Sequence, residues 1–245
     1  MGVLTIKKLT YKKIFDKLDL DIKKGSNITI LGSSGSGKSL LVSLINRGYK
    51  KKIKVTGNLV SVNSKVNEQI VGKNVLEQLK FHMELNHYSE RKISNRIKKI
   101  TSYFDIDDLL DKDPFYLSMG EKQLVILLSY LVLDMDIIVF DSAFGYLDKR
   151  LKNKVFEYIN GIKKLTIINF SSNPSDALLS KEVAIINKNI VYREAIECAF
   201  NSDKLYYSNG IDLPFMGELC LKLKYYDIVD KTILDMDELV NEIWK

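Results

Sequence analysis

Gly32-Ser33-Ser34-Gly35-Ser36-Gly37-Lys38-Ser39 fits the pattern G-x-x-x-x-G-K-[ST] of a phosphate-binding loop, so all eight residues are candidate nucleotide ligands. Glycine lets such a loop turn tightly and bring its backbone amides close to anionic oxygens. In this pattern Lys38 reaches the β- and γ-phosphates, and the Ser39 hydroxyl holds Mg²⁺. Apolar residues 27–31 predict a buried strand before the loop, and residues 40–45 predict a helix after it. The stretch therefore predicts a site for a nucleotide with Mg²⁺.

Apolar patterns on either side of the loop alternate between strand and helix. Strands are predicted at residues 3–6, 18–22, 137–141 and 165–170, and residues 53–62 show further strand pattern with a turn at 56–58. Residues 183–186 and 190–192 resemble a terminal hairpin around residues 187–189. Helical spacing predicts a helical subdomain over about residues 74–130 and a further helix at 155–162. Such alternation is typical of an α/β sheet covered on both faces. Tyr11 is expected in a loop between the first two strands, where its ring either stacks on a nucleobase or simply packs.

Residues 201–245 differ in character from the domain before them. Helices are predicted at residues 216–223 and 236–244, and the second carries the only tryptophan of the chain, Trp244. The apolar face of this second helix can bury against the rest of the chain or against a partner. A partner is favoured because the preceding domain is complete without it. We therefore expect a nucleotide-binding domain over residues 1–200 and a C-terminal helical extension over residues 201–245.

Composition narrows the classes of protein to consider. The chain has 245 residues, 46% of them hydrophobic, which suits a globular α/β protein. Cys198 and Cys220 are too few for a disulfide framework, and His82 and His87 have no neighbouring metal ligands. The start of the chain is not a secretory signal, and no apolar run reaches the roughly 20 residues of a membrane span. The net charge of +6 comes without interleaved basic and aromatic residues, so no nucleic-acid partner is expected, while attraction to an anionic membrane stays open.

Three further motifs follow the loop in order. Leu117-Ser118-Met119-Gly120-Glu121-Lys122-Gln123 opens an apolar helix, with Ser118 and Glu121 spaced as a capping box. A buried strand then ends at Asp141, and Leu147-Asp148 follows. In the order and spacing of these motifs, residues 3–192 resemble the ATP-binding subunit of an ABC transporter. The tail, with Leu213-Pro214 and Asp235-Met236-Asp237-Glu238-Leu239, is similar to the C-terminal extension of energy-coupling factor ATPases.

The resemblance implies a fold and a dimeric site. The implied fold is that of a P-loop NTPase of the ABC ATPase type. It has a RecA-like core, a small antiparallel β subdomain, a helical subdomain and the C-terminal helical extension. Two such subunits sandwich two ATP molecules. Ser118 and Gly120 would therefore reach the γ-phosphate in the partner's loop, and Asp148 would lie at the dimer seam.

Within one subunit, the resemblance implies that Tyr11 stacks on adenine and that residues 32–39 hold the phosphates. Ser39 and Asp141 would hold Mg²⁺, Asp141 through water. ATP and Mg²⁺ are the implied cofactors. Importers of this family also contain a second ATPase, a membrane coupling subunit and a substrate-capturing membrane subunit, and the extension implies dimerisation of the two ATPases. The chain would then lie in the cytoplasm, on the inner face of the plasma membrane.

Five positions depart from the family pattern. Ser142 stands where the family has the glutamate that activates water, and Ser172 stands where it has a histidine that contacts the γ-phosphate. In addition, Ser64 or Asn63 replaces a glutamine, Met119 replaces a glycine and Ala143 replaces a proline. Because a serine hydroxyl is a poor proton acceptor near neutral pH, we expect this chain to bind ATP but to cleave it slowly or not at all. Its signature residues would complete a hydrolysing site on a better equipped partner.

Two other functions fit the same motifs. One is a nucleotide-sensing structural protein that closes on ATP without useful hydrolysis. The other is an ABC-type ATPase that acts on nucleic acid, which the positive charge permits. That class usually joins two cassettes in one chain, whereas this sequence contains one phosphate loop. A small phosphotransferase is disfavoured because residues 117–123 have no role in such an enzyme.

Overall fold

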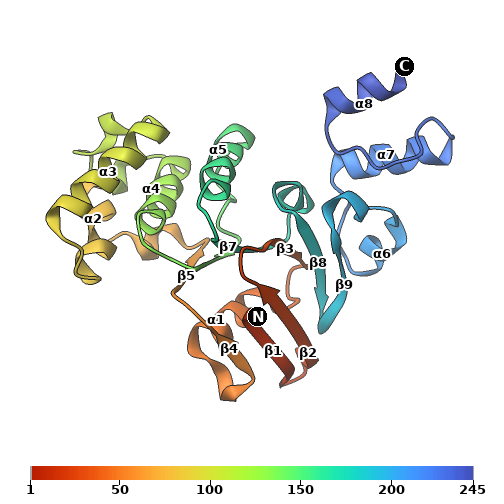
Figure 1. Cartoon of the computed structure of the whole chain (residues 1–245), viewed down its shortest axis with the longest axis horizontal. Helices are drawn as coiled ribbons and strands as arrows, with labels where there is room; N and C mark the ends of the chain where they lie inside the picture. The colour runs from red at the N-terminus through yellow and green to blue at the C-terminus, as the bar shows by residue number, and fades with distance from the viewer. Residues whose placement is uncertain (1, 245) are drawn as a thin grey trace. The chain divides into compact units, whose positions relative to one another are not determined.

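The structure, a computed structural model, describes residues 2–244 apart from the side chain of Lys50. It divides into two compact units (Figure 1). The first contains Met1–Thr56 together with Thr166–Lys245, and the second contains Gly57–Leu165. Among the described residues, no helix has both the length and the apolar character needed to cross a bilayer.

The first unit begins with a three-stranded antiparallel sheet. Its strands are β1 (Gly2–Tyr11), β2 (Phe15–Lys23) and β4 (Ile53–Val55), and β1 lies between the other two (Figure 1). Buried and exposed residues alternate along β2, as expected for a sheet with one face in the core. This sheet is the small antiparallel β subdomain that the sequence predicts.

The same unit contains a second group of strands around β3 (Asn27–Leu31). This strand runs parallel to β7 (Thr166–Ser171) on one side and to β8 (Glu182–Asn187) on the other. The last strand, β9 (Asn189–Ala195), pairs antiparallel with β8. Every residue of β3 and β7 is buried, which is typical of parallel strands covered on both faces. The predicted strands and terminal hairpin are confirmed.

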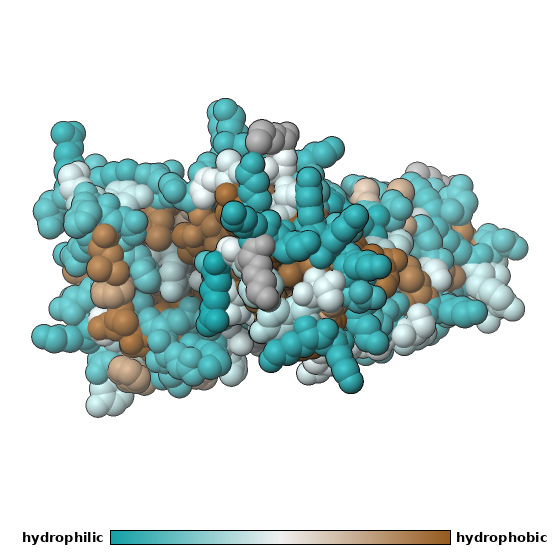
Figure 2. All heavy atoms as spheres, turned by 90° about the horizontal axis from the view of Figure 1, so that it is seen from below, coloured by the Kyte–Doolittle hydropathy of each residue, from teal (hydrophilic) through white to brown (hydrophobic). Residues whose placement is uncertain are grey.

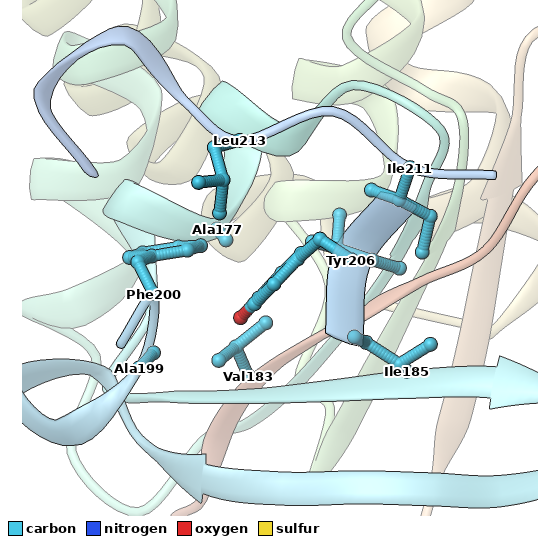
Figure 3. Close-up of a cluster of buried hydrophobic side chains, with 9 residues drawn as sticks. Ala177, Val183, Ile185, Ala199, Phe200, Tyr206, Ile211 and Leu213 are labelled. Carbon is cyan, nitrogen blue, oxygen red and sulfur yellow. The ribbon is translucent and has the colours of Figure 1, made fainter. Parts of the chain in front are cut away.

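The C-terminal residues of the first unit form three helices. These are α6 (Asp203–Ser208), α7 (Phe215–Tyr225) and α8 (Met236–Ile243). Side chains at the start of this region belong to the core of the first unit, as Figure 3 shows for Tyr206, Ile211 and Leu213. Further along, Leu239 of α8 joins a smaller cluster with α7. The remaining apolar side chains of α8, Met236, Val240 and Ile243, are exposed.

The second unit combines two parallel strands with a group of α-helices. Its strands are β5 (Leu59–Asn63) and β6 (Ile137–Asp141). Its helices are α2 (Val75–Leu85), α3 (Glu90–Phe104), α4 (Met119–Leu131) and α5 (Lys149–Asn160). Helix α2 packs against both α3 and α4, so the predicted helical subdomain is confirmed (Figure 1).

Short 3₁₀ segments connect these elements, and the phosphate loop leads into helix α1. The bounds of α1 are Lys38–Arg47. The 3₁₀ segments are η1 (Tyr49–Lys51), η2 (Val66–Gln69), η3 (Asp107–Leu109), η4 (Pro114–Tyr116), η5 (Pro174–Leu179) and η6 (Ile196–Cys198).

The first unit carries many exposed lysines, among them Lys7, Lys12, Lys17, Lys52 and Lys54. In the view from below, hydrophilic side chains stand out from the surface (Figure 2).

Candidate nucleotide site

The phosphate loop follows β3 directly and turns through backbone conformations that favour glycine. Gly35 has a φ of 84° and Gly37 a φ of 94°, both in the left-handed region. Gly37 is also the N-cap of α1, and because it has no side chain it leaves the first amides of the helix to a ligand. No acidic side chain lies in the first turn of α1. The loop therefore presents the positive end of the helix to an anion.

Lys38 is buried, and its ammonium lies inside the curve of the loop. The Nζ atom donates hydrogen bonds to the carbonyl oxygen of Gly32 at 2.6 Å and to that of Ser33 at 3.0 Å. A cation held over the loop in this way neutralises part of the charge of a phosphate that binds there.

The turn between β1 and β2 packs on the phosphate loop at Gly37. A Cβ on Gly37 would lie 2.7 Å from Cγ2 of Ile14 and 2.8 Å from Cζ of Phe15, so only glycine fits. Tyr11 pairs with Phe15 across this turn, which places Tyr11 near the loop. The expected loop position of Tyr11 is wrong, because Tyr11 is the last residue of β1. Its half-buried ring meets the ring of Tyr49 edge-on, with centroids 5.3 Å apart.

Strand β7 brings a second candidate position to the same place. Leu31 pairs with Ser171, and the amide of Gly32 donates to the carbonyl oxygen of Ser171 at 3.2 Å. Ser172 follows at once and is exposed, so the position where the family has histidine lies beside the start of the phosphate loop. The neighbouring Ser171 hydroxyl is not available there, since it donates to Oδ2 of Asp176 at 2.6 Å.

In the second unit, the carboxyl ends of β5 and β6 bring together two other candidate positions. Asn63 pairs with Asp141 in the parallel ladder, and Ser64 and Ser142 follow them. Asp141 is buried, whereas Ser142 is half-buried. Ser142 has a φ of 54°, a left-handed conformation that is uncommon for a residue with a side chain. Such backbone positions cluster at functional sites.

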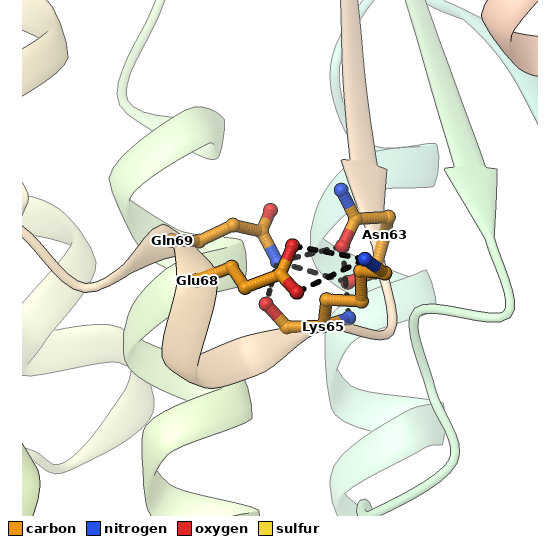
Figure 4. A network of polar contacts seen from close by, with 4 residues as sticks. All are labelled: Asn63, Lys65, Glu68 and Gln69. Atoms are coloured by element: carbon orange, nitrogen blue, oxygen red, sulfur yellow. Dashed lines mark hydrogen bonds and ion pairs between the residues drawn. The ribbon is translucent and has the colours of Figure 1, made fainter.

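Gln69 is a residue of this region that the sequence analysis did not single out. Its Nε2 atom donates to the backbone oxygen of Asn63 at 3.1 Å, to Oδ1 of Asn63 at 3.2 Å and to the backbone oxygen of Lys65 at 3.1 Å (Figure 4). Lys65 also pairs with Glu68 in this network. The one signal in the sequence was that Gln69 is the only glutamine between residues 59 and 74.

The predicted capping box at the signature helix is present. The Ser118 hydroxyl accepts from the amide of Glu121 at 3.3 Å, and Oε2 of Glu121 accepts from the amide of Ser118 at 2.8 Å and from its hydroxyl at 2.7 Å. These hydrogen bonds from Ser118 lower the pKa of the Glu121 carboxyl. Ser118 remains exposed at the start of α4.

The loop after β6 is fastened to the signature helix. The amide of Tyr146 donates to Oε1 of Gln123 at 3.1 Å, and the Gln123 side chain is fully buried. A Cβ on Gly120 would lie 3.2 Å from the carbonyl oxygen of Tyr146, so the loop passes close to the helix. At the end of this loop Asp148 caps α5, because its Oδ1 accepts from the amide of Leu151 at 2.7 Å.

The histidines and cysteines lie away from these positions in the sequence. The His82 ring stacks on Tyr130 with centroids 4.3 Å apart, and burial lowers the pKa of His82. Cys198 is exposed, and the Cys220 thiol donates to the carbonyl oxygen of Ile233 at 2.7 Å. Among residues 2–244, no three histidine, cysteine or acidic side chains gather as a metal cluster.

Comparisons with known proteins identify a family and similar proteins. A family model described as ABC transporter matches residues 15–145. The chain is 29% identical over 252 residues to the energy-coupling factor transporter ATP-binding protein EcfA1 of Mesomycoplasma hyopneumoniae, which covers 95% of this chain and 91% of that protein. It is 29% identical over 270 residues to the energy-coupling factor transporter ATP-binding protein EcfA of Pediococcus pentosaceus, which covers 99% of this chain and 96% of that protein.

A solved structure shows the same fold. The protein cbiO1 of Clostridium perfringens, described as part of the ABC transporter complex cbiONQ, superposes with a TM-score of 0.71 at 21% sequence identity. The superposition covers 89% of this chain and 98% of that one. The family match spans more than half of the chain and includes the phosphate loop, the signature residues and the strand that ends at Asp141. The chain therefore belongs to the ABC transporter family, within which it is similar to the energy-coupling factor transporter ATP-binding proteins.

Proposed function

We propose that this chain is the ATP-binding subunit of an energy-coupling factor importer whose own site binds ATP and Mg²⁺ but hydrolyses ATP slowly or not at all. One contrast carries the proposal. The phosphate loop keeps every residue that grips a triphosphate, while Ser142 and Ser172 occupy the positions of the two residues that help to cut it. Ligand-binding residues are retained and cleaving residues are lost.

Binding rests on the phosphate loop and its surroundings. The loop amides, the first turn of α1 and the Lys38 ammonium supply donors and positive charge for the phosphates. Tyr11 would stack on the base from the end of β1. Mg²⁺ prefers hard oxygen ligands and keeps several waters and phosphate oxygens, so the Ser39 hydroxyl and the Asp141 carboxylate are donors of a suitable kind. The ion would neutralise charge on the β- and γ-phosphates.

Weak hydrolysis follows from the chemistry of serine. A general base contributes about 10²–10⁴-fold to the rate of a reaction that deprotonates water, and a hydroxyl does not titrate near neutral pH. Ser172 offers a hydroxyl where an imidazole would contact the γ-phosphate. The rate losses from replacing several residues of one catalytic unit do not add. We therefore treat Ser142 and Ser172 together as the cause of slow hydrolysis.

The retained signature residues indicate what the chain does for a partner. Ser118 and Gly120 lie at the positive end of α4 and would reach the γ-phosphate bound by a second ATPase, with Asp148 at the seam between the two. We expect that second ATPase to carry the missing glutamate and histidine. The names of the relatives and of the cbiONQ complex support an assembly with a membrane coupling subunit and a substrate-capturing membrane subunit. The chain would then lie at the inner face of the membrane.

A structural role without transport is the second candidate, because a chain that closes on ATP without cutting it can act as a nucleotide sensor. The two functions differ in their partners. Co-purification with a membrane complex and a second ATPase supports the transporter subunit. Recovery without any membrane protein supports the sensor.

Separate measurements of binding and turnover test the proposal. Fluorescent ATP with Mg²⁺ should bind to the purified chain, and Lys38→Ala should abolish that binding because it removes the buried ammonium. Phosphate release by the same preparation should stay near background. Rapid turnover that is unaffected by Ser142→Ala would contradict the proposed defect, and absence of binding in the wild-type chain would contradict the proposed site.

A further inference from the structure

The turn at Asn209-Gly210, which follows α6 in the C-terminal extension, rests against the phosphate loop. We infer that Gly210 is a positioning residue for Ser33, so that nucleotide binding and the arrangement of the C-terminal extension are coupled. The inference rests on the proposed function in one respect, since it takes the phosphate loop to be the nucleotide site. The inference adds to that site a contact between Ser33 and Gly210, which lie far apart in the sequence.

The contact between Gly210 and Ser33 is close. A Cβ on Gly210 would lie 3.3 Å from Cβ of Ser33 and 3.8 Å from its Oγ. Gly210 also has a φ of 67°, so the turn uses the two properties of glycine, its small size and its backbone freedom. A larger residue would have to push the turn or Ser33 aside by a few tenths of an ångström.

The turn is held firmly on both sides. The Asn209 side chain accepts from Nδ2 of Asn187 at 3.0 Å and donates to the carbonyl oxygen of Leu205 at 2.8 Å, which ties β8 to α6. Next to the turn, Tyr206 and Ile211 point into a buried cluster (Figure 3). Leu31, the residue before the phosphate loop, belongs to the same cluster. The extension and the strand that carries the loop therefore share one core.

A displacement of Ser33 would be transmitted to the turn. The carbonyl oxygen of Ser33 receives a hydrogen bond from Lys38, the residue that would reach for the phosphates of a bound nucleotide. Gly32, beside Ser33, packs closely on β8, since a Cβ at that position would lie 2.9 Å from Cγ2 of Ile186. On the far side of the turn, Leu213 shares its cluster with Leu221 of α7. Neighbouring residues therefore connect the phosphate loop to α7 through Gly210 and this cluster.

The test compares two glycine substitutions in the full chain. Gly210→Ala introduces a Cβ against Ser33, whereas Gly25→Ala is a matched control with a φ of 78° and no atom within 4 Å of the new Cβ. Both variants should lower the melting temperature, because alanine is strained at a positive φ. Only Gly210→Ala should also weaken ATP binding, by about fivefold, which is ordinary for residues in direct contact.

A double-mutant cycle separates the contact from backbone strain. Ser33→Gly removes the side chain that the new Cβ meets, so Gly210→Ala should weaken ATP binding less in the Ser33→Gly background than in the wild-type chain. If Gly210→Ala fails to fold, Gly210→Asn serves instead, because asparagine accepts a positive φ but still carries a Cβ. A penalty on binding that is equal in both backgrounds would contradict a direct contact.

Hydrogen exchange reports whether the coupling reaches the extension. In the wild-type chain, ATP with Mg²⁺ should slow the exchange of backbone amides in α7, and Gly210→Ala should reduce this protection while Gly25→Ala preserves it. If the wild-type chain binds ATP but both variants behave alike, the inference about Gly210 is wrong and the nucleotide site stands. If the wild-type chain binds no ATP, the proposed function fails and the coupling fails with it.

Discussion

Ser142 sits in a left-handed backbone conformation directly after the buried carboxylate of Asp141, and in the proposed function it stands where hydrolysis needs a proton acceptor. Replacing Ser142 with glutamate and Ser172 with histidine should therefore restore hydrolysis at this chain's own site. The gain should be about 10²-fold, within the range that general bases supply. Phosphate release is measured in a complex in which the phosphate-loop lysine of the second ATPase has been replaced, so that only this site turns over.

The matched control keeps the size of the glutamate and removes its basicity. Ser142→Gln combined with Ser172→His should stay as slow as the wild-type chain, because an amide does not accept a proton from water. Equal rates for the glutamate and glutamine variants would show that proton transfer to residue 142 is not what the chain lacks.

Glu121 makes the signature cap dependent on pH. Hydrogen bonds from Ser118 lower the pKa of Glu121 below its ordinary value of 4.5, so the ionised carboxylate stabilises the folded chain above that value. This stability is lost as the pH falls through the lowered pKa. Ser118→Ala should cost about 1 kcal/mol of unfolding free energy at neutral pH, and the difference from the wild-type chain should shrink in acid. Urea unfolding across this pH range measures it, and a difference that grows in acid would contradict the capping role.

Most of the candidate residues could be named from the sequence, because the phosphate loop and the signature are local patterns. Gln69 could not, since its role depends on a hydrogen-bond network that folds η2 back onto Asn63. Gly210 could not either, because its neighbour Ser33 is far away in the sequence. A residue whose role depends on contacts between segments distant in the sequence has no local sequence motif that would identify it.

Among the elements, helix α4 and the loop after β6 form one structural piece through Gln123. Gln123→Ala should destabilise the chain by about 2 kcal/mol, because it leaves a cavity and breaks the hydrogen bond to the amide of Tyr146. Ser129→Ala is the control on the same helix, since its buried hydroxyl donates only to the carbonyl oxygen of Ile126. Urea unfolding and limited proteolysis of residues 142–148 compare the two. If Ser129→Ala loosens that loop as much, Gln123 does not anchor it.

The strands and long helices were predictable because their apolar periodicities span several turns or alternations. Helix α6 was not, since its six residues are too few to show a period. Helix α5 begins at Lys149, earlier than the predicted start at residue 155, because its first turns are polar and rich in lysine. Tyr11 lies in β1, not in a loop, because the strand pairing continues to Phe15. The ends of these elements are set by backbone hydrogen bonds, which the pattern of hydrophobic residues in the sequence does not reveal.

For the whole molecule, we propose that the exposed face of α8 takes part in assembly with other subunits. Val240 is 45% exposed although Leu239 beside it is buried, and Met236 and Ile243 are exposed as well. Val240→Lys should therefore weaken association with the second ATPase and leave the melting temperature of the isolated chain almost unchanged. Asn241→Lys, at an exposed polar position of the same helix, is the control. Size-exclusion chromatography with light scattering compares the two, and equal association would place the interface elsewhere.

The central proposal is that this chain binds ATP and supplies signature residues, while the second ATPase hydrolyses ATP. ATP turnover by the native complex tests it most directly. Two single variants of this chain are compared. Ser118→Ala should reduce turnover by about 10²-fold, because it removes a donor that would meet the γ-phosphate bound by the second ATPase. Ser142→Ala should leave turnover unchanged if, as proposed, the site in this chain does not hydrolyse ATP. The opposite pattern, with turnover insensitive to Ser118→Ala and lost in Ser142→Ala, would contradict the account.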